Sequence, residues 1–103
     1  MAWSLNLLGC VLRERGDELH AETMLKDSLR LHWELGDRWR SASVLEALGG
    51  IRRDPRLLGA AAALRARLAT PVPPAERARH ESDVSAVGTI AFDVAEAVEV
   101  VLG

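Results

Sequence analysis

The sequence predicts an all-α protein, a helical hairpin array of five to six helices of the kind found in α-solenoids. Apolar residues recur three and four positions apart along most of the chain, which is the spacing of one helical face. Gly-Asp pairs interrupt that pattern, as helix ends do. Only 4% of the chain is aromatic, so its core is built from Leu, Val and Ala, which suits closely packed helices better than a β-sandwich.

The first two helices are predicted over residues 2–15 and 18–35. The first ends at Gly16-Asp17, where Gly takes the left-handed conformation and Asp caps the helix that follows. The second ends at Gly36-Asp37, the same pair of residues. Each helix therefore has a defined end before the next begins.

A third helix is predicted over residues 38–53, and a fourth from Asp54-Pro55 to residue 68. Asp is a strong N-cap, and Pro is favoured at the first helical position. The proline-rich residues 70–74 cannot continue a helix and form a linker.

The last third of the chain predicts a helix over residues 75–87 and a short final helix capped by Asp93. Gly88 separates them. Residues 89–101 are rich in Val and Ile, so a strand in this stretch is the alternative that the sequence leaves open.

Two periods indicate a repeated unit. The Gly-Asp pair recurs after twenty residues, and the pattern Ala2-x-x-Leu5-x-x-Leu8-Gly9 recurs after forty, at residues 42–49. A repeating pair of helices is the mark of an α-solenoid, in which each unit buries its apolar face against the next. We expect Leu5 and Leu8 to face the partner helix, and Gly9 to let Ala21 approach closely.

The chain resembles a tetratricopeptide-type repeat. That family places apolar and small residues in its first helix where this sequence has Leu5, Leu8, Gly9 and Leu12, and in its second helix where it has Ala21, Leu25 and Ser28. The segments SLRLHWELGDRWRSASVLEALGG, RLLGAAAALRARL and PVPPAERARHE, in this order, are similar to the C-terminal helical array of actinobacterial LuxR-type regulators and related signalling ATPases. The resemblance implies tetratricopeptide-like repeats over residues 1–69 and a C-terminal helical extension over 75–103. The residues expected to pack the repeat are Leu5, Leu8, Gly9, Leu12, Ala21, Leu25, Ser28, Leu45, Leu48 and Gly49.

Charge and targeting signals limit which ligands and which cellular location are expected for this protein. The net charge is −2, so no global field attracts nucleic acid, although Arg52, Arg53 and Arg56 form a basic corner that leaves phosphate binding as a minor alternative. Residues 50–79 carry an excess of Arg and residues 80–103 an excess of acid, and we expect these charges to pair within the domain. One cysteine, no signal peptide and no apolar run of roughly 20 residues predict a cytoplasmic protein that does not enter membranes.

Catalysis and metal binding find little support in the sequence. His20 and His32 are twelve residues apart, far from the spacing that puts two metal ligands on one helix face, and His80 lies beyond the prolines. No phosphate-binding glycine loop is present, and no serine has a neighbouring base. We therefore expect no enzyme activity, no metal and no cofactor.

The function predicted is protein or peptide binding in a signalling or transcriptional regulator, the setting being implied by the resemblance alone. Such a chain could be a standalone remnant of a larger regulator. The alternative function is self-association into a homo-oligomer that binds no separate ligand. Trp33 and Trp39 flank one turn, and we expect both to pack between helices, with exposed binding anchors as the alternative. The candidate partner-binding residues are Asn6, Cys10, Arg13, Ser43, Glu46 and Ala47 on the first helix of each pair, together with Trp39.

Overall fold

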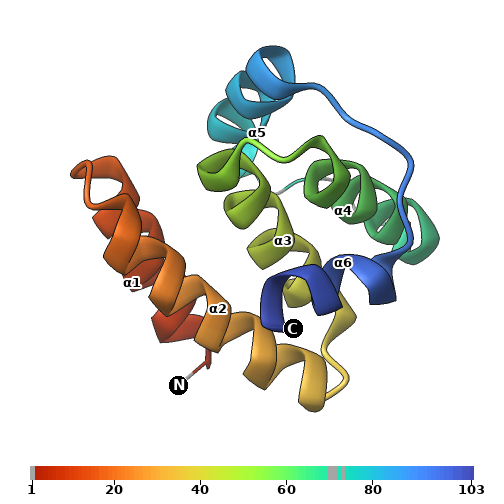
Figure 1. Cartoon of the computed structure of the whole chain (residues 1–103), viewed down its shortest axis with the longest axis horizontal. Coiled ribbons are helices and arrows are strands. Elements are labelled where there is room, and N and C mark those ends of the chain that lie inside the picture. The colour runs from red at the N-terminus through yellow and green to blue at the C-terminus, as the bar shows by residue number, and fades with distance from the viewer. Residues whose placement is uncertain (1, 70–71, 73) are drawn as a thin grey trace.

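The structure is a computed structural model that describes residues 2–69, 72 and 74–103, with side chains described from residue 8 onward except for residue 75. Within these residues it has six helices and no strand, which confirms the all-α prediction (Figure 1). The helices are α1 (Ala2–Glu14), α2 (Glu18–Glu34), α3 (Arg38–Arg52), α4 (Pro55–Leu68), α5 (Pro74–Val87) and α6 (Val94–Leu102).

The two Gly-Asp pairs end one helix and start the next, as predicted. Gly16 and Gly36 have φ angles of 84° and 76°, in the left-handed region that glycine adopts without a steric penalty. The following carboxylates then act as N-caps. Asp17 accepts a hydrogen bond from the His20 amide at 3.3 Å, and Asp37 accepts one from the Arg40 amide at 3.1 Å. The same short sequence thus sets both reversals of chain direction.

The turn between α3 and α4 has no glycine. Arg53 takes the left-handed conformation there, with φ of 52° and ψ of 48°. Asp54 caps α4 by accepting a hydrogen bond from the Arg56 amide at 2.9 Å, and Pro55 occupies the first turn. A non-glycine residue in this conformation costs about 1–2 kcal/mol, so this turn is less favourable than the two before it.

Helices that are consecutive in the sequence pack against one another, so α1 pairs with α2, α2 with α3, and α3 with α4. The core lies mainly among α2, α3 and α4 and is aliphatic throughout. Its largest fully buried apolar side chains are Leu25, Leu29, Leu45, Leu48, Leu57 and Leu58. The central helix α3 is buried along its whole length from residue 41 to residue 50, which accounts for its weak amphipathic pattern.

The last two helices take different places on this array. Helix α5 packs against α3 and α4, whereas α6 packs against α4 and α2. Residues 88–93 join them and run down one side of the molecule (Figure 1). The Ile90 amide in this stretch donates a hydrogen bond to the Pro55 carbonyl at 3.0 Å, which fixes the connection at the start of α4.

The open question between helix and strand near the C-terminus resolves in favour of helix α6. Asp93 caps it by accepting a hydrogen bond from the Glu96 amide at 3.0 Å. The buried residues of α6 follow helical spacing and are Val94, Ala97, Val98 and Val101. Burial of this stripe outweighs the β propensity of valine.

No helix within the described residues is both long enough and apolar enough to cross a bilayer.

Candidate functional site

The residues predicted to contact a partner lie on one stripe that the repeat places on α1 and again on α3. Because forty residues separate equivalent positions, Cys10 on α1 corresponds to Gly50 on α3. We call Cys10, Arg13, Ser43, Glu46 and Gly50 the α1–α3 face. In the structure this face is not open, because α5 lies against it.

Arg13 of α1 forms a paired contact with Asp83 of α5. Its Nη1 donates to Oδ2 at 3.0 Å and its Nη2 donates to Oδ1 at 2.6 Å, across 70 residues of sequence. Both side chains are largely withdrawn from water, with exposed fractions of 18% and 11%. Two parallel charge-assisted hydrogen bonds are a strong and directional form of ion pair. Gly50 makes room for it, since a Cβ at that position would collide with the Asp83 carboxylate.

A second contact joins α1 to α5 one turn away. Arg79 Nη1 lies 3.0 Å from Cys10 Sγ and donates to it, while its Nη2 donates to Glu76 Oε1 at 3.3 Å within α5. The Nε of Arg79 is buried without a hydrogen-bond partner. The Arg79 guanidinium therefore contacts the Cys10 thiol, but not all of its N–H groups have a hydrogen-bond acceptor there.

A buried charged cluster connects α3, α4 and α5. Arg65 of α4 donates from Nε to Glu46 Oε1 at 2.8 Å and from Nη2 to both Glu46 and Ser43 Oγ, the latter at 2.9 Å. His80 of α5 approaches the other oxygen of Glu46, with Nδ1 2.8 Å from Oε2. Neither atom has a hydrogen-bond partner, because the two are close but not aligned.

Desolvation makes this cluster energetically important. Glu46 is 1% exposed and Arg65 is 5% exposed, so neither charge can be hydrated. A buried charge costs several kcal/mol unless another charge and well-placed hydrogen bonds compensate for it. The pair therefore depends on both partners being present.

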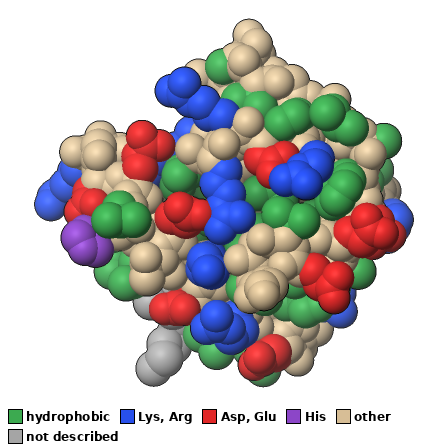
Figure 2. All heavy atoms as spheres, viewed as in Figure 1, with side chains coloured by type: hydrophobic (Ala, Val, Ile, Leu, Met, Phe, Trp, Pro, Cys, Tyr) green, Lys and Arg blue, Asp and Glu red, His purple; other side chains and the backbone are tan. Residues whose placement is uncertain are grey.

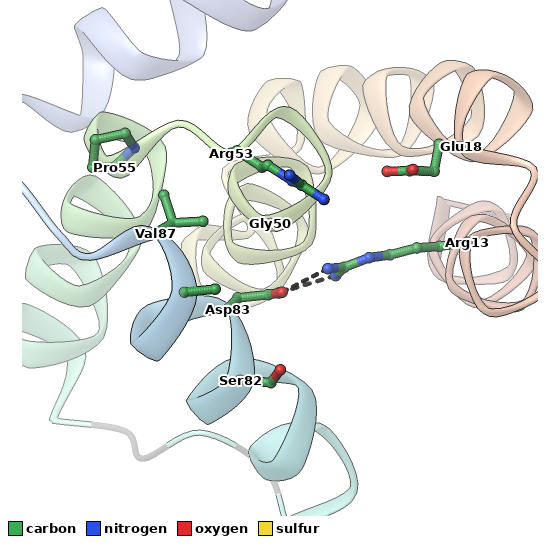
Figure 3. A pocket seen from close by; sticks show the side chains of 9 residues that line it. Arg13, Glu18, Gly50, Arg53, Pro55, Ser82, Asp83 and Val87 are labelled. Atoms are coloured by element: carbon green, nitrogen blue, oxygen red, sulfur yellow. Dashed lines mark hydrogen bonds and ion pairs between the residues drawn. The ribbon is translucent and has the colours of Figure 1, made fainter.

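A polar pocket of about 560 Å³ opens beside the Arg13–Asp83 contact. Its lining comes from the C-terminal end of α1, the start of α2, the C-terminal end of α3 and the turn after it, the start of α4 and the C-terminal half of α5. Figure 3 shows the side chains of Arg53 and Glu18 pointing toward each other from opposite sides of this pocket, with the ion pair between Arg13 and Asp83 below them in the view.

Ser43, Glu46 and Ala47 do not face solvent, so the expectation that they project outward is wrong. Their exposed fractions are 3%, 1% and 0%. The repeat places them on the outer side of a hairpin array, but α4 and α5 both pack over that part of α3. Where the array was expected to be open, the chain covers it with its own helices.

The remaining partner-binding candidates fall into three situations. Cys10 and Arg13 lie on the expected stripe but contact α5. Trp39 is 40% exposed, which contradicts the expectation that it packs between helices, whereas Trp33 packs against the core with the Arg38 guanidinium 3.5 Å from its ring centre. The side chain of Asn6 lies outside the described side chains.

The glycines at equivalent repeat positions lie where helices approach closely. A Cβ on Gly9 would stand 2.7 Å from Leu25 Cγ, and a Cβ on Gly49 would stand 2.9 Å from Leu58 Cγ. Gly9 also faces the Ala21 carbonyl, 3.2 Å from such a Cβ, which is the approach that the sequence predicted. The other buried members of the predicted repeat set are Ala21, Leu25, Ser28, Leu45 and Leu48.

Leu8 is less buried than expected for a residue facing the partner helix, since 47% of it is exposed. The adjacent Gly9 faces α2, and consecutive residues lie about 100° apart around a helix, so Leu8 lies to one side of that contact. Leu12 is half-buried, and the side chain of Leu5 lies outside the described side chains.

Four residues that hold the site together were missed, namely Arg65, Arg79, His80 and Asp83. Arg65 had a detectable signal, because it lies one turn beyond Ala61 on a stripe of small and apolar residues. A charge in such a position needs a buried counter-charge. The three residues of α5 gave no signal, since that helix has a weak apolar face from which its docking cannot be inferred.

The opposite charge excesses of residues 50–79 and 80–103 do not pair in the way expected. Arg52 contacts Glu22, Arg56 contacts Asp54 at 2.7 Å, and Arg79 contacts Glu76 at 3.3 Å, so these arginines find acids outside the acidic segment. On the face shown in Figure 2, basic and acidic side chains are interspersed.

The histidines occupy three separate environments. His20 is exposed beside Asp17, His32 is buried, and His80 contacts Glu46. Burial lowers the pKa of His32, and the Asp37 carboxylate, 3.6 Å from its Nδ1, opposes this only in part. Among the described side chains, no three His, Cys, Asp or Glu residues are grouped so that they could hold a metal ion.

Comparison of the chain with protein-family models, curated proteins and solved structures gave no match.

Proposed function

We propose that this protein binds a helical segment of another protein on its α1–α3 face, and that it acts by binding rather than by catalysis. The observation that supports this most directly is that the face already holds a helix, α5. Charged and polar contacts with both α1 and α3 hold it there. A surface that fixes one helix through defined charges has the chemistry to fix another of similar pattern.

The resemblance to tetratricopeptide-type repeats supports the same proposal. The close approaches at Gly9 and Gly49 fit a repeated pair of helices whose first members form a binding surface. On this view the protein is a cytoplasmic component of a signalling or transcriptional regulator. Its partner is a protein, and neither nucleic acid nor a membrane.

The test is a selection of displayed helical peptides on the immobilised full chain, followed by NMR mapping of the selected peptide. At 11.2 kDa the chain suits amide shift mapping. We expect shifts at Cys10, Arg13, Gly50 and Arg53. Shifts confined to the surroundings of Trp39, or the absence of any selected binder, would show that the α1–α3 face is not the binding site.

Self-association is the second candidate function, because α1 exposes apolar side chains on its outer side. Leu8 is 47% exposed and Val11, one turn along, is 44% exposed. Two copies paired through this side of α1 would cover both residues. Light scattering across a range of concentrations should then show a dimer that Val11→Glu abolishes, and a strict monomer at high concentration rejects this function.

A further inference from the structure

We propose that α5 is an internal occupant of the α1–α3 face, and that the partner is a helix with a basic residue three positions before an acidic one. These two residues would take the places of His80 and Asp83. This inference rests on the function proposed above and adds the partner's pattern and the means of its regulation. Its starting point is the contrast between the two C-terminal helices.

Helix α5 is held mainly by polar contacts, whereas α6 is held by apolar burial. No described side chain of α5 is fully buried, and its hydrogen bonds and ion pairs with α1 and α3 come from Arg79, His80 and Asp83. Helix α6 by contrast buries four apolar side chains in the core. A segment with few buried apolar contacts opens at lower free energy than its surroundings. Helix α5 can therefore leave the face while α6 stays in place.

Helix α5 also leaves buried polar groups on or near the face unsatisfied. Glu46 Oε2 is buried without a hydrogen bond although His80 Nδ1 lies 2.8 Å away, and Arg79 Nε of α5 itself is also buried without one. Such groups carry a desolvation cost that a better-matched ligand removes. An Arg or Lys in the place of His80 would donate to Glu46 Oε2, so a partner helix with that residue should compete successfully with α5.

Charge order fixes the orientation of the incoming helix. The face presents the Arg13 cation on α1 and the Glu46 carboxylate on α3, and α5 meets them with Asp83 and His80 respectively. Residues three apart lie on the same side of a helix, so one basic and one acidic residue at that spacing can contact the Glu46 carboxylate and the Arg13 guanidinium at the same time. A helix bound in the opposite direction would bring like charges together.

The experiment measures binding of a fluorescent peptide of residues 74–88 to full-length variants. Asp83→Ala frees the face from its internal occupant, and we expect it to bind the peptide at least about tenfold more tightly than the wild type, equivalent to ~1.4 kcal/mol. Glu81→Ala is the matched control, because Glu81 is an exposed acid on the same helix, and it should behave as the wild type. Asp83→Asn, which removes only the charge, gives the same readout if Asp83→Ala does not melt cooperatively.

Two altered peptides test the predicted pattern on the Asp83→Ala chain. A His80→Arg peptide should bind more tightly than the native peptide, and an Asp83→Ala peptide should bind about tenfold more weakly. Equal binding of the native peptide to wild type and Asp83→Ala overturns the proposal. If a selected peptide still maps to the α1–α3 face in that case, the proposed function survives. Dimers of the Asp83→Ala chain that the peptide dissociates would make a second copy the occupant and would also overturn it.

Discussion

The buried pair of Glu46 and Arg65 offers the most decisive test of how α3 and α4 are held together. We expect Arg65→Met to leave the Glu46 carboxylate buried, since that residue is only 1% exposed. Removal of one member of a buried pair costs about 3–5 kcal/mol. A domain of this size is stable by about 5–15 kcal/mol, so the loss is a large fraction of the total. Near the melting temperature it corresponds to a decrease of at least about 12 °C.

Replacement of both members should behave differently. In the double variant Glu46→Leu, Arg65→Met no charge remains buried at this place, so stability should return to within about 1 kcal/mol of wild type or exceed it. A double-mutant cycle from urea unfolding, followed by circular dichroism, gives the coupling free energy between the two residues.

Arg67→Met is the matched control, because Arg67 lies on the same helix and is exposed. It should change the free energy of unfolding by less than about 0.5 kcal/mol. If Arg65→Met costs no more than Arg67→Met, the Glu46 carboxylate is hydrated in solution. The tight packing of α4 and α5 over α3 would then be incorrect.

Three further predictions concern stability. Gly49→Ala should destabilise the chain by about 1–3 kcal/mol despite its better helix propensity, because the new methyl group would stand 2.9 Å from Leu58 Cγ; a stabilised variant in urea unfolding would disprove this close approach. Arg53→Gly should raise stability by about 0.5–1 kcal/mol because φ is 52° there, whereas Arg53→Ala keeps the Cβ and should give no such gain in the same assay. Burial lowers the pKa of His32 from 6.5, so its contribution is complete above pH 6.5 and is lost as the pH falls through its folded-state value. The urea midpoint should therefore fall less between pH 7.5 and 5 in His32→Gln, and an unchanged slope would contradict this account.

The helices themselves could be predicted because their signals are local. Gly16-Asp17 and Gly36-Asp37 combine a helix end with a helix start, and Asp93 caps α6 although valine favours strands. Each of these depends on residues within one turn. Such short-range hydrogen bonds depend mainly on neighbouring residues, so the sequence pattern predicts them.

The composition of the site could not be predicted, because it depends on where α5 docks. The repeat grouped Cys10, Arg13 and Glu46 on one stripe, but it gave no reason for that stripe to be covered. The docking of α5 rests on single polar contacts such as the Arg13–Asp83 pair, made across 70 residues. Contacts of that kind leave no periodic pattern in the sequence, unlike the apolar stripe that places α6.

The position of Cys10 makes the rate of its chemical modification a measure of whether α5 is docked. It is the chain's only cysteine, it lies beneath α5, and Arg79 Nη1 is 3.0 Å from its sulfur. Cys10 is partly exposed even with α5 in place, but the Arg79 contact restricts access to its sulfur, so an alkylating reagent reaches this thiol more readily once that helix has moved away. The rate of modification of the native chain should therefore rise when α5 leaves, and a ligand that replaces the helix will lower it again, whereas one that binds elsewhere will not.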